Sequence, residues 1–121
     1  MSSFDKVTIV GGSGFIGTRL VNRLNRAGES DLCIVDKVLS ETYTQKCRIS
    51  DVRNYEDLLN SITEDSVLIN LAAEHRDDVR PIQLYHDVNV DGAKNICAVA
   101  RAKNIKKIIF TSSVAVYGFA A

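Results

Sequence analysis

A short glycine-rich segment near the start of the chain constrains the possible fold more than any other feature. The apolar run at residues 7–10 leads directly into residues 11–17, which read Gly-Gly-Ser-Gly-Phe-Ile-Gly. Ile16, Leu20 and Leu24 then recur about one helical turn apart. A strand, a glycine turn and a helix in this order form the context that a dinucleotide-binding fingerprint requires.

Each of three glycines in this segment has its own expected role. Gly11 allows the tight turn, Gly14 lets the backbone approach a pyrophosphate, and Gly17 lets the helix pack close to the strand. The free N–H groups at the start of the helix would face the phosphates, aided by the helix dipole. The alternative is an ordinary glycine-rich turn between a strand and a helix, which would not need all three glycines.

Strand and helix patterns alternate along the rest of the chain. The expected strands are residues 6–10, 32–36, 46–49, 67–71 and 107–111, and the expected helices are residues 15–27, 55–62 and 82–103. Gly28 occupies a C-cap position of the first helix, and Asn54 is a candidate N-cap of the second. Near-continuous apolar strands separated by helices predict the α/β class, with a doubly wound parallel sheet of order 3-2-1-4-5.

Length and composition exclude several classes of protein. The 121 residues suffice for one domain with a core, and the 15 basic and 15 acidic residues balance. A zero net charge argues against binding to nucleic acid or to a membrane surface, and no apolar run approaches the length of a membrane span. Cys33, Cys47 and Cys97 are interpreted as buried free thiols of a reducing cytoplasm, and their spacing suggests no metal site.

The last residues of the sequence bear on domain organisation. Residues 114–121 follow the fifth strand directly, and no helical pattern comes after it. The apolar strand at residues 108–110 would then form an uncovered edge, which natural proteins usually avoid. We therefore expect residues 1–121 to be the N-terminal part of a longer protein, with the fold cut after its fifth strand. The piece alone is expected to aggregate or to pair with another chain through that edge.

Asp36 ends the second strand, about 20 residues beyond the glycine turn. A carboxylate at this position can accept hydrogen bonds from both hydroxyls of an adenosine ribose, and it would repel a 2′-phosphate. NAD is therefore favoured over NADP, although the adjacent Lys37 could soften that choice. The alternative is a solvated acid at the end of a strand.

Small and polar residues follow the ends of the next strands. Asp51 could accept a hydrogen bond from an adenine amino group, while Val52 lines the slot for the base. Residues 71–73 read Leu-Ala-Ala, and the small residues among them would let a flat cofactor pass over the end of the fourth strand. His75 or Arg76 could contact phosphate or substrate, although a solvated charged loop is the simpler interpretation.

Polar residues of two further segments lie at the same predicted crevice. Asn89 is the one strongly polar member of an otherwise apolar face of the third helix. A buried amide without a partner costs about 1–3 kcal/mol, so Asn89 should bond backbone near the cofactor, in a structural or a functional role. Hydroxyls at Thr111, Ser112 and Ser113 leave the fifth strand, where they can hydrogen-bond a substrate oxygen. No Ser/His/Asp arrangement supports nucleophilic catalysis.

Together these segments resemble the extended short-chain dehydrogenase/reductase family, in particular its NAD-dependent nucleotide-sugar epimerases and dehydratases. The resemblance rests on residues 11–17, Asp36, 51–52, 71–73, 89–92 and 111–118, in the order and spacing of that family. It implies a Rossmann fold whose NAD contacts are Gly11, Gly14, Phe15, Ile16, Asp36, Asp51, Val52, Leu71, Ala72 and Ala73. Gly17, Lys37 and Asn89 complete the predicted cofactor site.

The resemblance also implies a reaction, in which hydride passes from a sugar to NAD and returns. Ser113 matches the family's catalytic hydroxyl, which assists the tyrosine of a Tyr-x-x-x-Lys motif. Tyr117 has no lysine four residues later, because the sequence ends at Ala121, and the family's substrate domain is absent. Ala93 stands where the family often has threonine. We therefore expect a cytoplasmic enzyme that acts on a nucleotide sugar, with a homo-oligomer as a candidate assembly, and an inactive 121-residue piece.

Two other functions stay open at the level of sequence. The same fold could serve a non-catalytic NAD(P)-sensing or scaffold protein, since fold alone does not set function. A simple NAD(P)-dependent reductase of the hydroxysteroid or aldehyde type is the other alternative. A Tyr-x-x-x-Lys motif in the parent gene would favour an enzyme over a sensor, and net consumption of NAD(P)H would favour the reductase.

Overall fold

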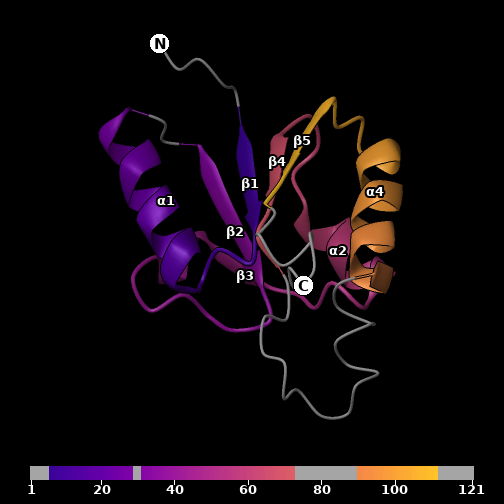
Figure 1. Cartoon of the computed structure of the whole chain (residues 1–121), viewed down its shortest axis with the longest axis horizontal. Helices are drawn as coiled ribbons and strands as arrows, with labels where there is room; N and C mark the ends of the chain where they lie inside the picture. Colours follow the sequence, from indigo (N-terminus) through magenta and orange to yellow (C-terminus); the bar gives the residue numbers. More distant parts are fainter. Residues whose placement is uncertain (1–5, 29–30, 73–89, 112–121) are drawn as a thin grey trace, which may run out of the picture.

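A five-stranded parallel sheet forms the centre of the molecule (Figure 1). The computed structural model describes residues 6–28, 31–72 and 90–111. Its strands are β1 (Val7–Val10), β2 (Leu32–Asp36), β3 (Cys47–Ile49), β4 (Val67–Asn70) and β5 (Lys107–Phe110). They lie in the order β3-β2-β1-β4-β5, and every neighbouring pair is parallel. The predicted α/β class and strand order are confirmed.

Helices cover both faces of this sheet (Figure 1). Helix α1 (Phe15–Arg26) lies on one face, and α2 (Tyr55–Ser61) and α4 (Gly92–Ala102) lie together on the other. All four residues of β1 are buried, because crossovers on both sides cover its two faces. One buried cluster on the α1 side includes Val21, and the other, on the α2 and α4 side, includes Leu58 and Ile96.

The helix ends follow the local signals in the sequence. Helix α1 ends one residue earlier than expected, with Ala27 as its C-cap and Gly28 just beyond it at φ +90°. Only glycine adopts that conformation at little cost, which explains the stop. Helix α2 begins after Asn54, whose side chain accepts a hydrogen bond from the Asp57 N–H at 3.1 Å. The predicted N-cap is therefore confirmed.

Several expectations need correction or fall outside the described residues. A short 3₁₀ helix, η1 (Thr44–Lys46), precedes β3 and was not anticipated. The third predicted helix is described only from its later part, since residues 82–89 lie outside the described ranges. Within those ranges, no helix has both the length and the apolar character needed to cross a bilayer.

The cysteines are free but only half-buried, so the expectation of buried thiols is wrong. Cys47 lies on β3, the last strand at its edge of the described sheet, where two of three residues are exposed. Cys33 lies on the neighbouring β2, and its partial burial raises the pKa of its thiol. Cys97 lies on α4, as predicted. Cys47 and Cys97 lie on an edge strand and on a helix surface, which do not enclose their side chains on all sides.

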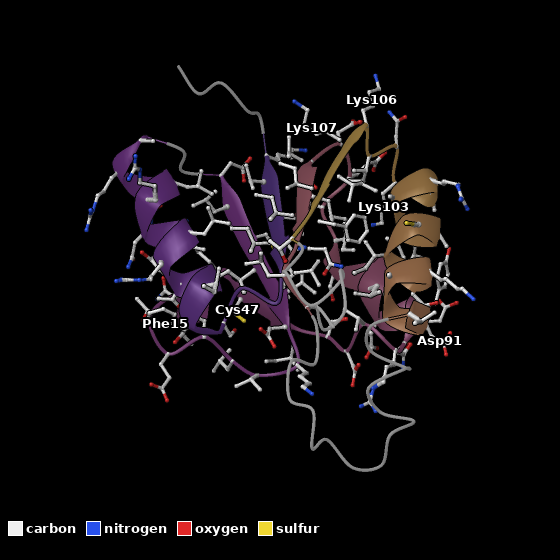
Figure 2. All side chains as sticks on the ribbon, in the orientation of Figure 1. Phe15, Cys47, Asp91, Lys103, Lys106 and Lys107 are labelled. Carbon is white, nitrogen blue, oxygen red and sulfur yellow. The ribbon has the colours of Figure 1, made fainter. Side chains whose placement is uncertain are left out.

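Strand β5 carries the exposed apolar surface that the sequence suggests. Ile109 and Phe110 are each nearly half exposed, whereas Ile108 packs against the buried cluster under α4. Figure 2 shows Lys106 and Lys107 at the amino-terminal end of the sheet, and Phe15 and Cys47 at the opposite end. The glycine turn, and with it the candidate site, lies at that opposite, carboxyl-terminal end.

Candidate functional site

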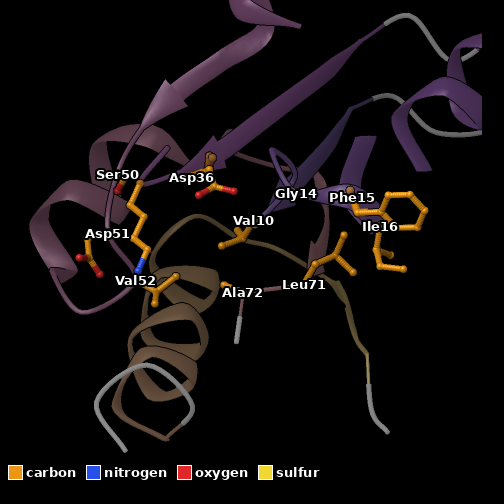
Figure 3. A pocket seen from close by; sticks show the side chains of 14 residues that line it. Val10, Gly14, Phe15, Ile16, Asp36, Ser50, Asp51, Val52, Leu71 and Ala72 are labelled. Atoms are coloured by element: carbon orange, nitrogen blue, oxygen red, sulfur yellow. The ribbon is translucent and has the colours of Figure 1, made fainter. Parts of the chain in front are cut away.

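A cavity of about 370 Å³ opens at the carboxyl ends of β1, β2, β3 and β4 (Figure 3). It lies where the strand order reverses between β1 and β4, the position at which doubly wound sheets bind ligands. Its size falls in the range of about 300–1,000 Å³ that is usual for small-molecule sites. The cavity is lined by Val10, Gly11, Gly14, Phe15, Ile16, Gly17, Val35, Asp36, Lys37, Ser50, Asp51, Val52, Leu71 and Ala72.

The structure gathers every described residue of the predicted cofactor site around this one cavity. Ala73 and Asn89 lie outside the described residues, as do the predicted catalytic Ser113 and the charged loop with His75 and Arg76. Three lining residues were not predicted, namely Val10, Val35 and Ser50. Val10 and Val35 each precede a predicted site residue at a strand end, so strand ends alone could have indicated them.

The glycine turn is held by contacts that no larger residue could make. Gly11 has φ +81°, and a Cβ atom there would lie 2.6 Å from the backbone nitrogen of Ala72. A Cβ atom on Gly17 would lie 2.4 Å from the Cα of Gly12. Helix α1 therefore packs directly on the turn that follows β1. A Cβ atom on Gly14 would meet no atom within 4 Å, which leaves open space above the turn.

The start of α1 offers unoccupied hydrogen-bond donors to this open space. Gly14 is the N-cap and supplies no side-chain acceptor, and the first turn contains no acidic residue. The first N–H groups of a helix have no acceptor inside the helix, and they carry the positive end of the helix dipole. Phe15 and Ile16 are 75% and 62% exposed and flank these donors. This arrangement fits an anion such as a pyrophosphate.

Asp36 is tied to the glycine turn rather than simply solvated. Its Oδ2 accepts a hydrogen bond from the Ser13 N–H at 3.0 Å, and its Oδ1 accepts one from the Val38 N–H at 3.1 Å. The Ser13 hydroxyl donates to the Val38 carbonyl at 2.6 Å and closes this small network. Each carboxylate oxygen keeps acceptor capacity beyond these bonds, so Asp36 can still receive ribose hydroxyls.

Asp51 has a partner that the sequence interpretation did not include. Arg53 donates from Nε to Oδ1 at 3.0 Å and from Nη2 to Oδ2 at 2.6 Å, and the Arg53 N–H also reaches Oδ1 at 3.0 Å. The hydrogen bonds from Arg53 hold the pKa of Asp51 below its usual range, and the charge of Lys37 acts in the same direction. Asp51 therefore faces the cavity as a carboxylate whose oxygens are already engaged.

Val52 and Ser50 flank Asp51 and are both buried. The carbonyl of Val52 accepts a hydrogen bond from Nδ2 of Asn95 on α4 at 2.9 Å. Helix α4 therefore fixes this wall of the cavity. Ser50 is 3% exposed, and its N–H donates to the Asp36 carbonyl at 2.8 Å. Its Oγ has no hydrogen-bond partner in the described part of the chain.

The described lining residues are suited to binding rather than to catalysis. Apolar side chains form the walls, and the only titratable ones in the described lining are Asp36, Lys37 and Asp51. A row of free N–H donors lies at one part of the cavity, and the Asp36 acceptor lies beside them. A ligand with an anionic centre, a sugar diol and a flat base would satisfy these groups together.

Comparison with known proteins shows which family and which relatives the chain is similar to. The model of the 3-beta hydroxysteroid dehydrogenase/isomerase family matches residues 8–120. The chain is 44% identical over 114 residues to N-acetyl-alpha-D-glucosaminyl-diphospho-ditrans,octacis-undecaprenol 4-epimerase of Escherichia coli O157:H7, with 94% of this chain and 34% of the relative covered. It is 30% identical to the bifunctional UDP-glucose and UDP-xylose 4-epimerase 1 of Pisum sativum, with 98% and 39% covered.

A solved structure agrees with these relatives. MoeE5 in complex with UDP-glucose and NAD is 25% identical and superposes with a TM-score of 0.81, covering 95% of this chain and 38% of MoeE5. The chain thus spans between 34% and 39% of the length of the first curated relatives.

Proposed function

The chain belongs to the 3-beta hydroxysteroid dehydrogenase/isomerase family, and from this premise we propose that it binds NAD as the dinucleotide-binding part of a sugar epimerase or dehydratase. Family membership agrees with the resemblance to the extended short-chain dehydrogenases/reductases seen in the sequence. The observation that carries the proposal is the pairing of an uncapped helix start with the anchored Asp36 carboxylate on one cavity.

Different lining residues would bind different parts of the cofactor. The backbone from Gly14 to Ile16 would hold the pyrophosphate, because its donors face open space. Asp36 would accept the hydroxyls of the adenosine ribose, and the base would lie against Val52. Leu71 and Ala72 would let the cofactor pass over the end of β4. Bound NAD would supply the chemistry by accepting and returning hydride, while these residues bind and orient it.

Preference for NAD over NADP follows from the position of Asp36. A 2′-phosphate would lie against a carboxylate whose position Ser13 and Val38 already fix. Lys37 lines the same cavity, and its positive charge opposes this effect. Calorimetric titration of the complete gene product with NAD and NADP tests the proposal. We expect NAD to bind at least about tenfold more tightly, since a close like-charge contact costs more than about 1.4 kcal/mol. Equal or tighter binding of NADP would contradict it.

We propose a sugar joined to a diphosphate as the substrate class. A UDP-glucose and UDP-xylose 4-epimerase among the relatives and the structure of MoeE5 with UDP-glucose and NAD support a nucleotide sugar. The higher identity to a polyprenyl-diphosphate sugar epimerase, 44% against 30%, favours a lipid-linked sugar as the second candidate. An assay of the complete gene product with UDP-N-acetylglucosamine and with its undecaprenyl-diphosphate counterpart distinguishes them. Turnover of neither, with net oxidation of NADH by a simple carbonyl substrate, would instead favour the reductase alternative.

The catalytic step would require residues beyond the described site. By family resemblance Ser113 would supply the catalytic hydroxyl, and a Tyr-x-x-x-Lys base and a sugar-binding domain would come from outside these 121 residues. The partial coverage of the two curated relatives and of MoeE5 named above supports this division. We expect the 121-residue chain to bind NAD without any epimerase, dehydratase or reductase turnover, because a general base must lie within hydrogen-bond reach of its proton. Sugar turnover by the chain alone would contradict this expectation.

A further inference from the structure

Ser13 is a residue of the glycine turn whose side chain the proposed cofactor contacts do not use. Its N–H donates to Oδ2 of Asp36 at 3.0 Å, a bond that would survive replacement of Ser13 by alanine. Its hydroxyl makes a second bond that alanine could not make, because Oγ donates to the Val38 carbonyl at 2.6 Å. Ser13 is half-buried and does not line the cavity. Any effect of this side chain on the site therefore passes through the residues that it holds.

Three hydrogen bonds join the glycine turn and the end of β2 in a closed ring. Asp36 accepts the Ser13 N–H through Oδ2 and the Val38 N–H, at 3.1 Å, through Oδ1. The Val38 carbonyl then accepts the Ser13 hydroxyl. Sγ of Cys47 on β3 lies 3.5 Å from the same hydroxyl oxygen and 3.9 Å from the same carbonyl. The hydroxyl thus restrains Val38, the residue whose N–H holds one oxygen of Asp36.

Residues 37–39, which follow β2, have little other support. The side chains of Val38 and Leu39 are 60% and 46% exposed. Within the described ranges, residues 37–39 form no backbone–backbone hydrogen bond with another segment. The same residues include Lys37, which lines the cavity beside Asp36. Their conformation therefore decides how the carboxylate and the cation of this part of the cavity lie relative to each other.

We propose that Ser13 is a positioning residue whose hydroxyl sets the preference for NAD over NADP. This inference rests on the proposed function, in which Asp36 receives the adenosine ribose at the cavity (Figure 3). The closed ring holds the carboxylate where its remaining acceptor capacity meets ribose hydroxyls and its charge meets a 2′-phosphate. Without the hydroxyl, residues 37–39 would be free to move. That movement would loosen the hold on Asp36 and let Lys37 approach the phosphate.

The variant Ser13→Ala removes the hydroxyl and keeps the N–H that bonds Asp36. Ser13 has no positive φ, so alanine fits its backbone conformation. Calorimetric titration of the complete gene product should show the ratio of NAD affinity to NADP affinity lowered by about two- to tenfold, the effect of one net hydrogen bond. The ratio for 5′-AMP and adenosine 2′,5′-bisphosphate should fall by the same factor, because these probes also differ only in the 2′-phosphate. Ser13→Thr keeps a hydroxyl and should keep the ratio of the unmodified protein.

Thr44→Val is the matched control in the connection between β2 and β3. Oγ1 of Thr44 donates to the Ser40 carbonyl at 2.8 Å, so this variant also loses one bond from a hydroxyl to a backbone carbonyl. Neither Thr44 nor Ser40 lines the cavity. Thr44→Val should lower the melting temperature about as much as Ser13→Ala does, and it should leave the affinity ratio unchanged.

The possible outcomes separate this inference from the proposed function. If Ser13→Ala fails to fold, or weakens NAD and NADP equally, the hydroxyl is structural and only this inference is wrong. A ratio that falls equally in Thr44→Val or in Ser13→Thr would contradict the inference in the same way. If the unmodified protein binds NAD and NADP equally, the preference argued from Asp36 fails together with the inference. If the unmodified protein binds neither cofactor, the proposed function itself fails.

Discussion

The starts of helices α1 and α2 solve the same physical problem in opposite ways. Both helices follow a strand of the same parallel sheet, and both begin with N–H groups that lack acceptors inside the helix. At α2 the chain satisfies them itself, since Asn54 caps the helix and Glu56 and Asp57 lie in its first turn. At α1 the N-cap is Gly14, which has no side-chain acceptor, and the first turn of the helix contains no acidic residue.

This difference separates a structural helix start from one prepared for a ligand. The capped start of α2 is stabilised by its own side chains and gains little from an anion. The open start of α1 faces a cavity, with no atom within 4 Å of the position where a Gly14 side chain would begin. Stability and ligand affinity should therefore respond separately to changes at the two helix starts.

The largest effect is expected from Gly11→Ala, which should distort the glycine turn that leads into α1. Alanine at φ +81° costs about 1–2 kcal/mol, and overlap with the Ala72 backbone adds about 1–3 kcal/mol. Denaturant unfolding should show a loss of about 2–5 kcal/mol, and binding of NAD should be lost with the turn. Gly28→Ala is the control, because Gly28 has φ +90° with open space around it and should lose only the first contribution. Equal losses in the two variants would refute the close approach of Gly11 to β4.

The variant Gly14→Ala should weaken binding while largely sparing the fold. Gly14 has φ −78° and ψ −173°, which any residue adopts, and apart from its chain neighbours no atom of the described residues lies within 4 Å of the new methyl group. The methyl would stand where the pyrophosphate approaches the helix donors, whose charge-assisted bonds contribute about 1.5–3 kcal/mol each. Calorimetry should show NAD affinity reduced at least about tenfold, with stability changed by less than about 1 kcal/mol. Unchanged affinity would mean that the α1 start does not hold the anion.

The opposite response is expected from Asn54→Ala at the start of α2. Loss of the hydrogen bond to the Asp57 N–H should cost about 0.5–2 kcal/mol of stability, the usual effect of removing an N-cap. Affinity for NAD, measured by the same titration, should not change, because Asn54 does not line the cavity. An affinity loss matching that of Gly14→Ala would contradict the division of roles between the two helix starts.

The smallest effect concerns Asp51, at the turn that leads into α2. Arg53 lowers the pKa of Asp51 in the folded state, so the pair contributes stability that is present above the unfolded pKa of about 3.9. That stability is lost as the pH falls through the lower folded pKa. Both side chains are partly exposed, at 26% and 42%, so the contribution should be about 0.2–1 kcal/mol.

Unfolding free energies measured between pH 6 and the acid limit test this pair. Asp51→Asn should lose the stability at neutral pH and flatten the acid part of the profile, and Arg53→Gln should do the same. A profile of Asp51→Asn that still falls in parallel with that of the unmodified chain would assign the acid dependence to other carboxylates.

Local signals explain why so much of this fold could be predicted. The apolar strand runs, the glycine after α1 and the cap before α2 each act within a few residues, so they are legible without knowledge of the packing. Small deviations remained at the ends of elements, where hydrogen bonding stops gradually. Gly11, Gly14 and Asp36 could be assigned to one site because the carboxyl ends of parallel strands meet at one edge of the sheet.

By itself, the sequence determined the order of strands and helices and the residues that end each strand beside the cavity. Only the tertiary structure decided that the Ser50 hydroxyl is buried without a hydrogen bond to any described residue, that Asp36 binds Ser13 of the turn, and that Arg53 pairs with Asp51. It also decided that the cysteines are only half covered. The physical reason is that burial and hydrogen bonding of a side chain depend on which distant elements pack against it, and residue types and spacing do not report that packing.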